Sequence, residues 1–469
     1  MRAALVALLA FASLACAPPR AAVATEPGVD VCRFDVRVAT VRPLLLDVTA
    51  SCEGTALAGL GFDDPRLRRY LSVPVENGRP LLDRGTRFEL AAAKPRAVFQ
   101  YRVDLGRAAR EREDFDFALE SGESVIAPAS TFLLHPLPLR AETRIELRVQ
   151  APTGFGFDSG LERRGDAYLL QAHEISVATY CVFGRFAERV LELPGGRIEL
   201  VLLDGAPRLA IDDLAGWVER RARLIADFYG HFPAARTLLV LVPVEGEAAV
   251  LFGKLLPESA PGVAVLLGTR TGAAALERDW ILLHELFHIG VPSFDDEGKW
   301  FDEGLATYFE PILRVRAGML SELELWREFG RGMPRGLPSL AHYGLERAPG
   351  YAGMYWGGAV YCLLADVELR KSSGLTLGLE DAVRAVFSGG GRSSDVWSLD
   401  ETFALAERTL DTDVLSSLRK RHADRPAPVD LDALFAELGV VVRDGNVLAL
   451  RNDAPLSSVR GALAHPPAR

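Results

Sequence analysis

Hydrophobic and polar residues alternate over short stretches between about residues 28 and 195. The segments 99–105 and 143–149 show this alternation clearly, and turn-forming residues separate such stretches from one another. A period of two places successive side chains on opposite faces, which is typical of half-buried β-strands. We therefore predict an N-terminal antiparallel β-sandwich domain over residues 25–195.

The pattern changes at Pro194-Gly195-Gly196, where longer apolar runs and helical periods begin. Strands are expected at 198–203, 237–244 and 262–268, and an amphipathic helix is expected at 211–229. Further helices are expected near 302–316, 354–372, 376–387 and 398–409, the last beginning with a Ser398–Glu401 capping box. Strands followed by a mostly helical half indicate an α+β domain over residues 196–428. Residues 429–469 predict a short C-terminal helix and a hairpin turning at 444–445.

Length and composition indicate a folded protein of two or three domains. The chain has 469 residues, of which 49% are hydrophobic and 25% charged, with a formal net charge of −10. This charge argues against nucleic acid or an anionic membrane surface as a main partner. Beyond the N-terminus, no segment approaches 18 unbroken apolar residues, so we expect no transmembrane segment in the mature protein. Oligomeric state is left open by the sequence.

The N-terminus resembles an export signal. Met1-Arg2 gives a short positive region, and residues 3–14 form an apolar run that is too short to span a bilayer. Small residues at 15–17 and 22–24 fit two alternative cleavage patterns, so we predict a signal peptide over residues 1–24. The protein is then exported to the periplasm or the extracellular space. The segment 13–16 also resembles a bacterial lipobox, which leaves a lipid anchor at Cys16 as the alternative to simple cleavage.

The other cysteines fit an exported protein. Cys32 and Cys52 flank two strand-like runs, and a hairpin folded about residue 42 brings them opposite each other, which predicts a disulfide. Cys181 and Cys362 lie among aromatic and apolar residues and are interpreted as buried thiols.

A motif with metal-ligand spacing stands out in the second half of the chain, His284-Glu285-x-x-His288. Apolar residues at 276, 280, 283 and 287 recur around it at helical spacing, and Gly290 ends the run. On a helix, His284 and His288 lie one turn apart and can reach one ion. Glu285 is rotated away by about 100° and can hold a water. The structural alternative is a buried pair of histidines that bind no metal.

A third ligand is available in the segment Trp300-Phe-Asp302-Glu303-Gly304, at the start of a helix-like stretch. Catalytic zinc usually takes three protein ligands and one water, so His284, His288 and Glu303 predict a Zn²⁺ site with Glu285 as the adjacent base. Asp302 has two interpretations, as a residue that orients a ligand or as a helix cap. Pro311 is expected to kink or break this helix.

The two motifs together resemble those of the gluzincin metallopeptidases, which include the aminopeptidase N family and the glycyl aminopeptidase family. The resemblance covers roughly residues 200–425, and the W-F-x-E-G form of the second motif is closer to the glycyl aminopeptidases. It implies a thermolysin-like catalytic domain, a peptide or protein substrate, and Glu285 as general base. The loop between His288 and Glu303 is shorter than in typical members of either family.

The resemblance also suggests a substrate-binding strand and a second donor. The family's Gly-x-Met-Glu-Asn strand corresponds to residues 261–267, so Gly262–Val265 is expected to be an edge strand beside the substrate. This segment contains no carboxylate to pair a substrate amine, with Glu258 as the nearby alternative. The family's tyrosine that stabilises the oxyanion corresponds to Tyr355, with Tyr351 and Tyr308 as alternative donors.

The sequence therefore predicts an exported zinc metallopeptidase, with aminopeptidase activity as one form of it. Two alternatives remain: a non-catalytic binding protein on a peptidase-like scaffold, and a zinc hydrolase that acts on substrates other than peptides.

Overall fold

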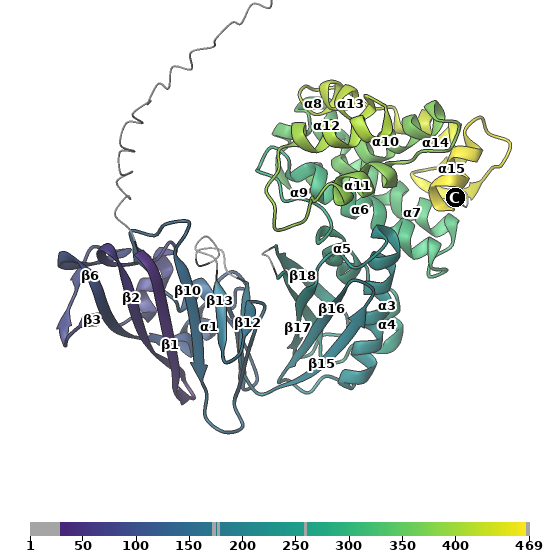
Figure 1. Cartoon of the computed structure of the whole chain (residues 1–469). Helices are drawn as coiled ribbons and strands as arrows, with labels where there is room; N and C mark the ends of the chain where they lie inside the picture. Colours follow the sequence, from purple (N-terminus) through teal and green to yellow (C-terminus); the bar gives the residue numbers. More distant parts are fainter. Residues whose placement is uncertain (1–28, 171–174, 176–178, 258–259, 466–469) are drawn as a thin grey trace, which may run out of the picture.

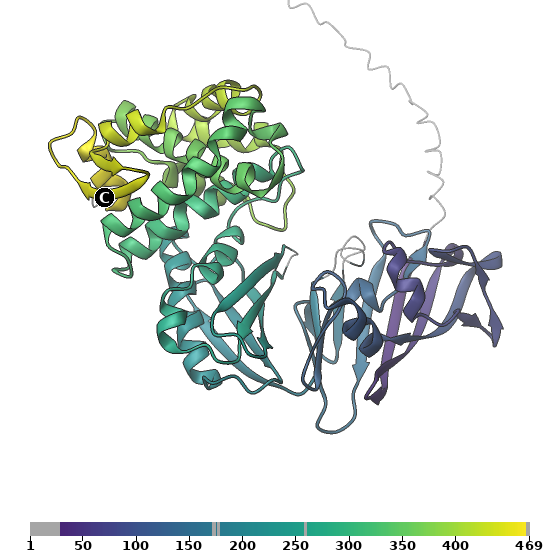
Figure 2. The ribbon, with the colours of Figure 1, turned by 180° about the vertical axis from the view of Figure 1, so that it is seen from behind.

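The computed structural model describes residues 29–170, 175, 179–257 and 260–465 (Figures 1 and 2). The predicted signal peptide, Cys16 and Glu258 lie outside these residues. N-terminal β-sheets, a central mixed sheet and a C-terminal helical region follow one another along the chain (Figure 1). This arrangement confirms the predicted α+β fold. No helix in the described part of the chain is both long and apolar enough to cross a membrane.

Two sheets make up the N-terminal region. The ten-stranded sheet contains β1 (Val29–Val41), β2 (Leu44–Gly61), β3 (Val75–Glu76), β4 (Arg79–Pro80), β5 (Leu82–Asp83), β6 (Arg87–Asp104), β9 (His135–Leu137), β10 (Arg144–Gln150), β12 (Glu162–Arg164) and β13 (Ala167–Leu170). The four-stranded sheet contains β7 (Leu119–Ser121), β8 (Ser124–Pro128), β11 (Gly156–Ser159) and β14 (Tyr180–Gly184). Helix α1 (Leu105–Arg112) follows β6. The sheets share one core, to which Phe34 and Leu46 contribute from the first sheet and Ala127 and Phe183 from the second. All described pairs are antiparallel except β1 with β10, which is parallel.

The β1–β2 hairpin places Cys32 directly opposite Cys52, and the two form the predicted disulfide. Cys181 and Cys362 are free and buried, as predicted. Burial raises the pKa of the Cys181 thiol to about 12. Both cysteines therefore act as small apolar side chains rather than as nucleophiles.

The central sheet has the strand order β15-β16-β17-β19-β18 and comprises β15 (Phe186–Leu193), β16 (Gly196–Leu203), β17 (Arg236–Val244), β19 (Gly262–Gly268) and β18 (Val250–Leu256). Helix α3 (Ile211–Tyr229) matches its predicted range. Successive residues of β17 face different cores: Leu239 and Leu241 face the helices, and Val240 faces the N-terminal sheets. Burial on both faces explains why this strand reads as a continuous apolar run.

The predicted edge position of Gly262–Val265 is wrong. Strand β19 pairs with β17 on one side and β18 on the other, so the edge is β18, which the sequence analysis did not predict. The segment 250–256 reads Val-Leu-Phe-Gly-Lys-Leu-Leu and lacks a clear period of two. The order in which strands pair also depends on contacts between residues distant in sequence, and a local sequence pattern does not contain this information.

Helices form the rest of the molecule. They are α4 (Ala273–Glu277), α5 (Ile281–His288), α6 (Lys299–Arg316), α7 (Glu322–Gly332), α8 (Leu337–His342), α9 (Gly350–Ala352), α10 (Gly358–Ser372), α11 (Leu379–Ser388), α12 (Leu399–Leu410) and α13 (Val414–His422). The Ser398–Glu401 capping box of α12 is present as predicted. The C-terminal segment consists of α14 (Leu431–Glu437), the hairpin β20 (Val440–Arg443) with β21 (Asn446–Leu450), and α15 (Ser457–Ala464). Its buried residues Phe435 and Leu463 belong to the same core as the other helices.

Two helix expectations need correction. The motif helix does not include positions 276 and 280, because α4 ends at Glu277 and the Asp279 carboxylate accepts hydrogen bonds from the first N–H groups of α5. Pro311 was expected to kink or break α6, and the structure excludes the break, because α6 continues to Arg316. A buried proline inside a helix costs about 3 kcal/mol, and the buried neighbours Phe309 and Ile312 offset this by packing.

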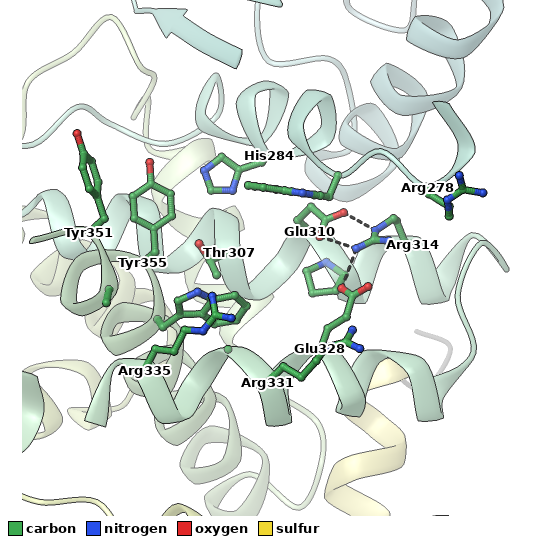
Figure 3. Close-up of a pocket in the computed structure, with 15 residues that line it drawn as sticks. Arg278, His284, Thr307, Glu310, Arg314, Glu328, Arg331, Arg335, Tyr351 and Tyr355 are labelled. Carbon is green, nitrogen blue, oxygen red and sulfur yellow. Dashed lines mark hydrogen bonds and ion pairs between the residues drawn. The ribbon is translucent and has the colours of Figure 1, made fainter. Parts of the chain in front are cut away.

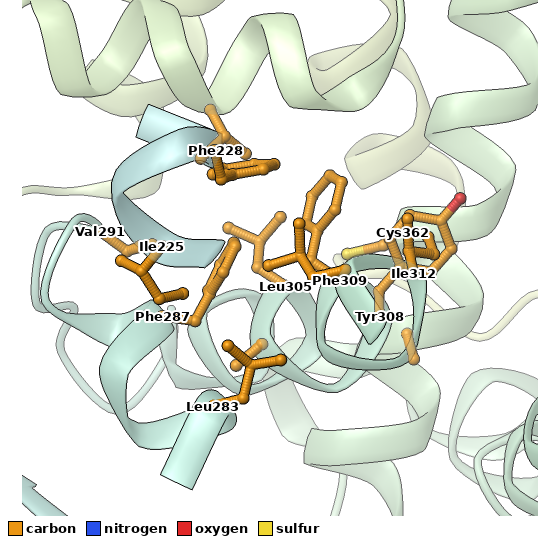
Figure 4. Close-up of a cluster of buried hydrophobic side chains, with 14 of the residues drawn as sticks. Ile225, Phe228, Leu283, Phe287, Val291, Leu305, Tyr308, Phe309, Ile312 and Cys362 are labelled. Atoms are coloured by element: carbon orange, nitrogen blue, oxygen red, sulfur yellow. The ribbon is translucent and has the colours of Figure 1, made fainter. Parts of the chain in front are cut away.

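The core beneath the motif helix holds α3, α5 and α6 together (Figure 4). The ring of Phe287 lies 5.3 Å from that of Phe228 and 5.5 Å from that of Phe309. Leu283 and Leu305 complete the contact. Helix α5 is thus fixed from below while His284 and Glu285 lie along its other sides.

Candidate active site

Helices α5 and α6 bring His284, His288 and Glu303 together, as the motif spacing predicts. The Nε2 atom of His284 lies 3.2 Å from Glu303 Oε2, and Nε2 of His288 lies 3.6 Å from the same oxygen. One ligand atom from each residue falls within a group no more than 4.8 Å across. Ligands bound tetrahedrally at about 2.1 Å from zinc are separated by about 3.4 Å, so these distances suit such an ion.

A hydrogen bond between His288 and Asp302 orients the His288 imidazole toward the same site. Its Nδ1 lies 2.6 Å from Asp302 Oδ1. A proton on Nδ1 is donated to this carboxylate, which leaves the Nε2 lone pair directed at the site. The structure therefore favours the first interpretation of Asp302, as the residue that orients a ligand. The two imidazoles and the Glu303 carboxylate, together with the hydrogen bond between His288 and Asp302, fit a zinc ion.

Opposite charges compensate one another in this buried cluster. Burial alone would lower the pKa of His288, but the carboxylates of Asp302 and Glu303 raise it well above its ordinary value. Burial alone would raise the pKa of Glu303, but hydrogen bonds from His284 and His288 hold it well below its ordinary value. Glu303 is therefore ionised, as a metal ligand must be.

Glu285 points away from this group and toward the edge strand. Its Oε2 accepts a hydrogen bond of 2.9 Å from the N–H of Leu255 in β18. Strand and helix approach so closely that a Cβ atom on Gly253 would lie 2.7 Å from Glu285 Cγ. Burial raises the pKa of Glu285, while the nearby histidines oppose this. A carboxylate with a raised pKa is suited to accept and return a proton.

Tyr355 lies against His284. Its ring stacks on that of His284, with ring centres 5.7 Å apart and an interplanar angle of 7°. Burial raises the pKa of its hydroxyl most, and the charges of Glu303 and Glu285 raise it further. The phenol therefore keeps its proton and is able to donate it in a hydrogen bond.

Local backbone geometry explains why Tyr355 reaches the site. Residues 353–357 form one π-helical turn before α10, an irregularity that changes the direction of a side chain. Helices α6 and α10 also cross at two glycines, since a Cβ on Gly304 would lie 2.6 Å from the backbone of Gly358. The helices that carry Glu303 and Tyr355 can therefore approach backbone to backbone.

The two other candidate tyrosines are placed differently. The Tyr308 hydroxyl donates to Asp366 over 2.9 Å in the interior of the helical region. Tyr351 is 77% exposed, and its ring centre lies 6.1 Å from that of Tyr355.

A cavity of about 610 Å³ opens beside His284 and Tyr355 (Figure 3). Thr307 and Glu310 of α6 form one wall, and residues of α7 form another. Its remaining lining residues are Arg278, Trp280, Pro311, Arg314, Glu328, Arg331, Gly332, Arg335, Tyr351, Ala352 and Trp356. Apart from Trp280, Pro311 and Tyr351, these residues carried no signal in the sequence, because they come from separate helices and form no motif.

The N-terminal region supports the other side of the site. Lys254 of β18 forms an ion pair with Asp116, and the ring of Phe115 stacks on Phe252 with centres 5.8 Å apart. Leu251 and Phe252 remain 38% and 47% exposed. This strand therefore presents apolar side chains and an unpaired edge next to Glu285.

Comparison with solved structures identifies the fold. The chain is similar to an aminopeptidase N family protein from Idiomarina loihiensis, with a TM-score of 0.71 and 15% identity, over 88% of this chain and 79% of that one. It is also similar to an M1 zinc metallopeptidase from Deinococcus radiodurans, with a TM-score of 0.53 and 16% identity, over 86% of this chain and 96% of that one. A variant of the latter bound to a Tyr-Ser-Ala substrate gives a TM-score of 0.53 at 15% identity, over 86% and 96% of the two chains. No protein-family model and no curated protein matches this chain. The fold is thus that of the aminopeptidase N-like gluzincins.

Proposed function

We propose that this protein is an exported zinc metallopeptidase that hydrolyses peptide bonds. The main support is one arrangement: three zinc-type ligands within 4.8 Å of one another, with a separate glutamate held at the adjacent edge strand. His284, His288 and Glu303 would hold the ion. When bound, Zn²⁺ supplies the Lewis acidity that polarises a carbonyl and brings the pKa of water near 7.

Glu285 is the proposed general base. Its Oε2 is held by the N–H of Leu255, which leaves Oε1 to accept the proton of the attacking water. The raised pKa of this carboxyl suits it to pass the proton on to the departing amine. Tyr355 is the proposed donor to the oxyanion that the attack creates.

Strand β18 is the proposed binding edge for the substrate backbone. It is the last strand of the central sheet, and it lies against the helix that carries Glu285. An extended peptide that adds to such an edge gains main-chain hydrogen bonds. Leu251 and Phe252 offer apolar contacts to its side chains.

Export of the protein is part of the proposal. The disulfide between Cys32 and Cys52 is compatible with an oxidising compartment. Cleavage after the signal peptide and lipid attachment at Cys16 remain the two alternatives for the mature N-terminus.

Zinc analysis combined with a peptide-library digest tests the proposal. We expect about one zinc per chain and cleavage of peptides. Glu285→Gln should keep the metal and abolish turnover, because the variant lacks only the base. Glu303→Ala should lower zinc affinity instead. Rapid peptide hydrolysis by Glu285→Gln would contradict the mechanism.

The same measurements distinguish the alternatives. Bound zinc without cleavage of any peptide would favour a zinc hydrolase of other substrates. A protein that binds peptides and lacks both zinc and turnover would favour a binding scaffold. The geometry disfavours the scaffold, because all three ligands and the base are in place.

A further inference from the structure

The cavity beside His284 is positively charged, although the whole chain carries a formal charge of −10. Four arginines and two glutamates line it. They are Arg278, Arg314, Arg331 and Arg335, with Glu310 and Glu328. The excess of positive charge is therefore local to this cavity and does not reflect the general composition.

Only one of these arginines is neutralised within the cavity. Arg314 is buried and donates to Glu310 over 3.0 Å and to Glu328 over 2.8 Å (Figure 3). Both glutamates are thus committed to the same guanidinium. Neither glutamate forms an ion pair with the other three arginines in the described part of the chain.

The side chains of Arg278, Arg331 and Arg335 form no hydrogen bond or ion pair with any residue that the structure describes. They come from three places: the turn before α5, the end of α7, and the turn that follows it. Arg278 lies at the opposite end of the cavity from Tyr355 (Figure 3). A guanidinium keeps its charge at any physiological pH and presents a planar set of donors that matches a carboxylate.

The cavity also continues directly from the proposed reaction centre. His284 and Tyr355 line it, as do Trp280 and Trp356. Its volume of about 610 Å³ lies in the range of ligand-binding pockets. A peptide with its scissile carbonyl at His284 can therefore extend one end into a space with aromatic walls and arginines.

We infer that this cavity, with the unpaired side chains of Arg278, Arg331 and Arg335 along it, is a subsite that selects peptides carrying a negative charge beyond the scissile bond. The charge is either the C-terminal carboxylate of a short peptide or an acidic side chain. This inference rests on the proposed peptidase function and adds a substrate class to it.

Matched peptides separate the two sources of carboxylate. One pair differs only in a free or amidated C-terminus, and a second, amidated pair differs only in Asp or Asn at each position in turn. We expect the charged member of one pair to have a KM at least roughly tenfold lower than that of its uncharged twin, with a similar kcat. The preference should weaken with added salt, because exposed charges are screened.

Arginine variants assign the effect to the cavity. In the double variant Arg331→Gln with Arg335→Gln, and separately in Arg278→Gln, charged and uncharged peptides should bind more equally. Arg408→Gln is the matched control, since Arg408 is an exposed arginine on α12, away from the cavity lining. This control should keep the full preference of the parent.

Binding measured without turnover separates this inference from the proposed function. Calorimetry in a Glu285→Gln background uses the same peptide pairs and needs no hydrolysis. Tighter binding of charged peptides that the arginine variants lose would support the subsite, even if no peptide were cleaved. Equal binding and equal cleavage of the charged and uncharged members would overturn the subsite and leave the peptidase proposal intact.

Discussion

Glu285 and Glu303 have the same side chain and different surroundings. Glu303 faces two imidazoles, which lower the pKa of its carboxyl against the effect of burial. Glu285 faces an apolar strand and one backbone N–H, and burial raises its pKa. The two carboxyls are therefore suited to different tasks, one as a permanent anion and ligand, the other as a proton carrier.

Tyr355 allows a direct test at the scale of a single atom. Tyr355→Phe retains the ring that stacks on His284 and removes only the hydroxyl. We expect kcat to fall by roughly 10²–10³, as for the loss of one oxyanion donor, with zinc content and melting temperature nearly unchanged. Steady-state kinetics and metal analysis on the same preparation give the measurement. An unchanged kcat would assign Tyr355 to packing and make Tyr351 the next candidate.

At the scale of elements, the distance between α6 and α10 decides whether Glu303 and Tyr355 meet. A Cβ atom on Gly358 would lie 2.1 Å from the carbonyl oxygen of Trp300. Gly358→Ala should therefore force the helices apart and destabilise the protein by about 1–3 kcal/mol, with a loss of activity. Thermal unfolding and peptide hydrolysis provide the readouts.

Gly461→Ala is the control for this effect, because a Cβ there meets nothing within 4 Å. Alanine is the better helix former, so this variant should be neutral or stabilised by up to about 1 kcal/mol. If Gly358→Ala were as stable and active as Gly461→Ala, the close helix crossing would not be required.

Periodic segments were predictable from the sequence, and relationships between segments were not. Helix α3 and the hairpin at Asp444-Gly445 follow from local patterns, and the structure confirms both. Strand β18 was missed because it lacks alternation, and the edge was assigned to β19 instead. The zinc-type ligands were predictable because they lie in two short motifs, whereas the cavity arginines have no common sequence signature.

Strand β18 also leads to a prediction about the substrate's N-terminus. The described strands β18 and β19 contain no carboxylate that could form an ion pair with a peptide's free amine next to Glu285. The Asp116 carboxylate, which reaches β18, is already paired with Lys254. An N-acetylated peptide should therefore be cleaved at a rate comparable to that of its free twin. Parallel digestion of both peptides checks this. If the acetylated peptides were never cleaved, another acid must hold the amine, and Glu258 would be the first to replace.

At the scale of the whole molecule, the N-terminal sheets and the central sheet act as one unit because they share a buried interface. Tyr180 and Val182 pack against Val240 and Ala264 in one apolar cluster. Arg236 of the central sheet reinforces this contact by donating to the carbonyl oxygens of residues 159–161 and to Glu199. The wall that supports β18 is thereby fixed relative to the central sheet.

We expect Asp158 to make the stability of this interface depend on pH. Burial raises the pKa of its carboxyl from 3.8 to about 6, and Arg236, 3.9 Å away, opposes this only in part. Because the folded state holds the proton more tightly, the stability that Asp158 contributes is fully present below about pH 4 and is lost as pH rises through about 6. A difference of about two pH units corresponds to about 3 kcal/mol at most.

Asp158→Asn imitates the protonated side chain and tests this dependence. The variant should match the parent at pH 4 and exceed it in free energy of unfolding at pH 7, because only the parent has to bury a charge there. Urea denaturation at the two pH values gives the comparison, with Asp432→Asn, at an exposed acid on α14, as control. A variant less stable than the parent at pH 7 would mean that the ionised carboxylate is stabilised by Arg236. The junction would then be held by an ion pair at neutral pH rather than by a buried acid.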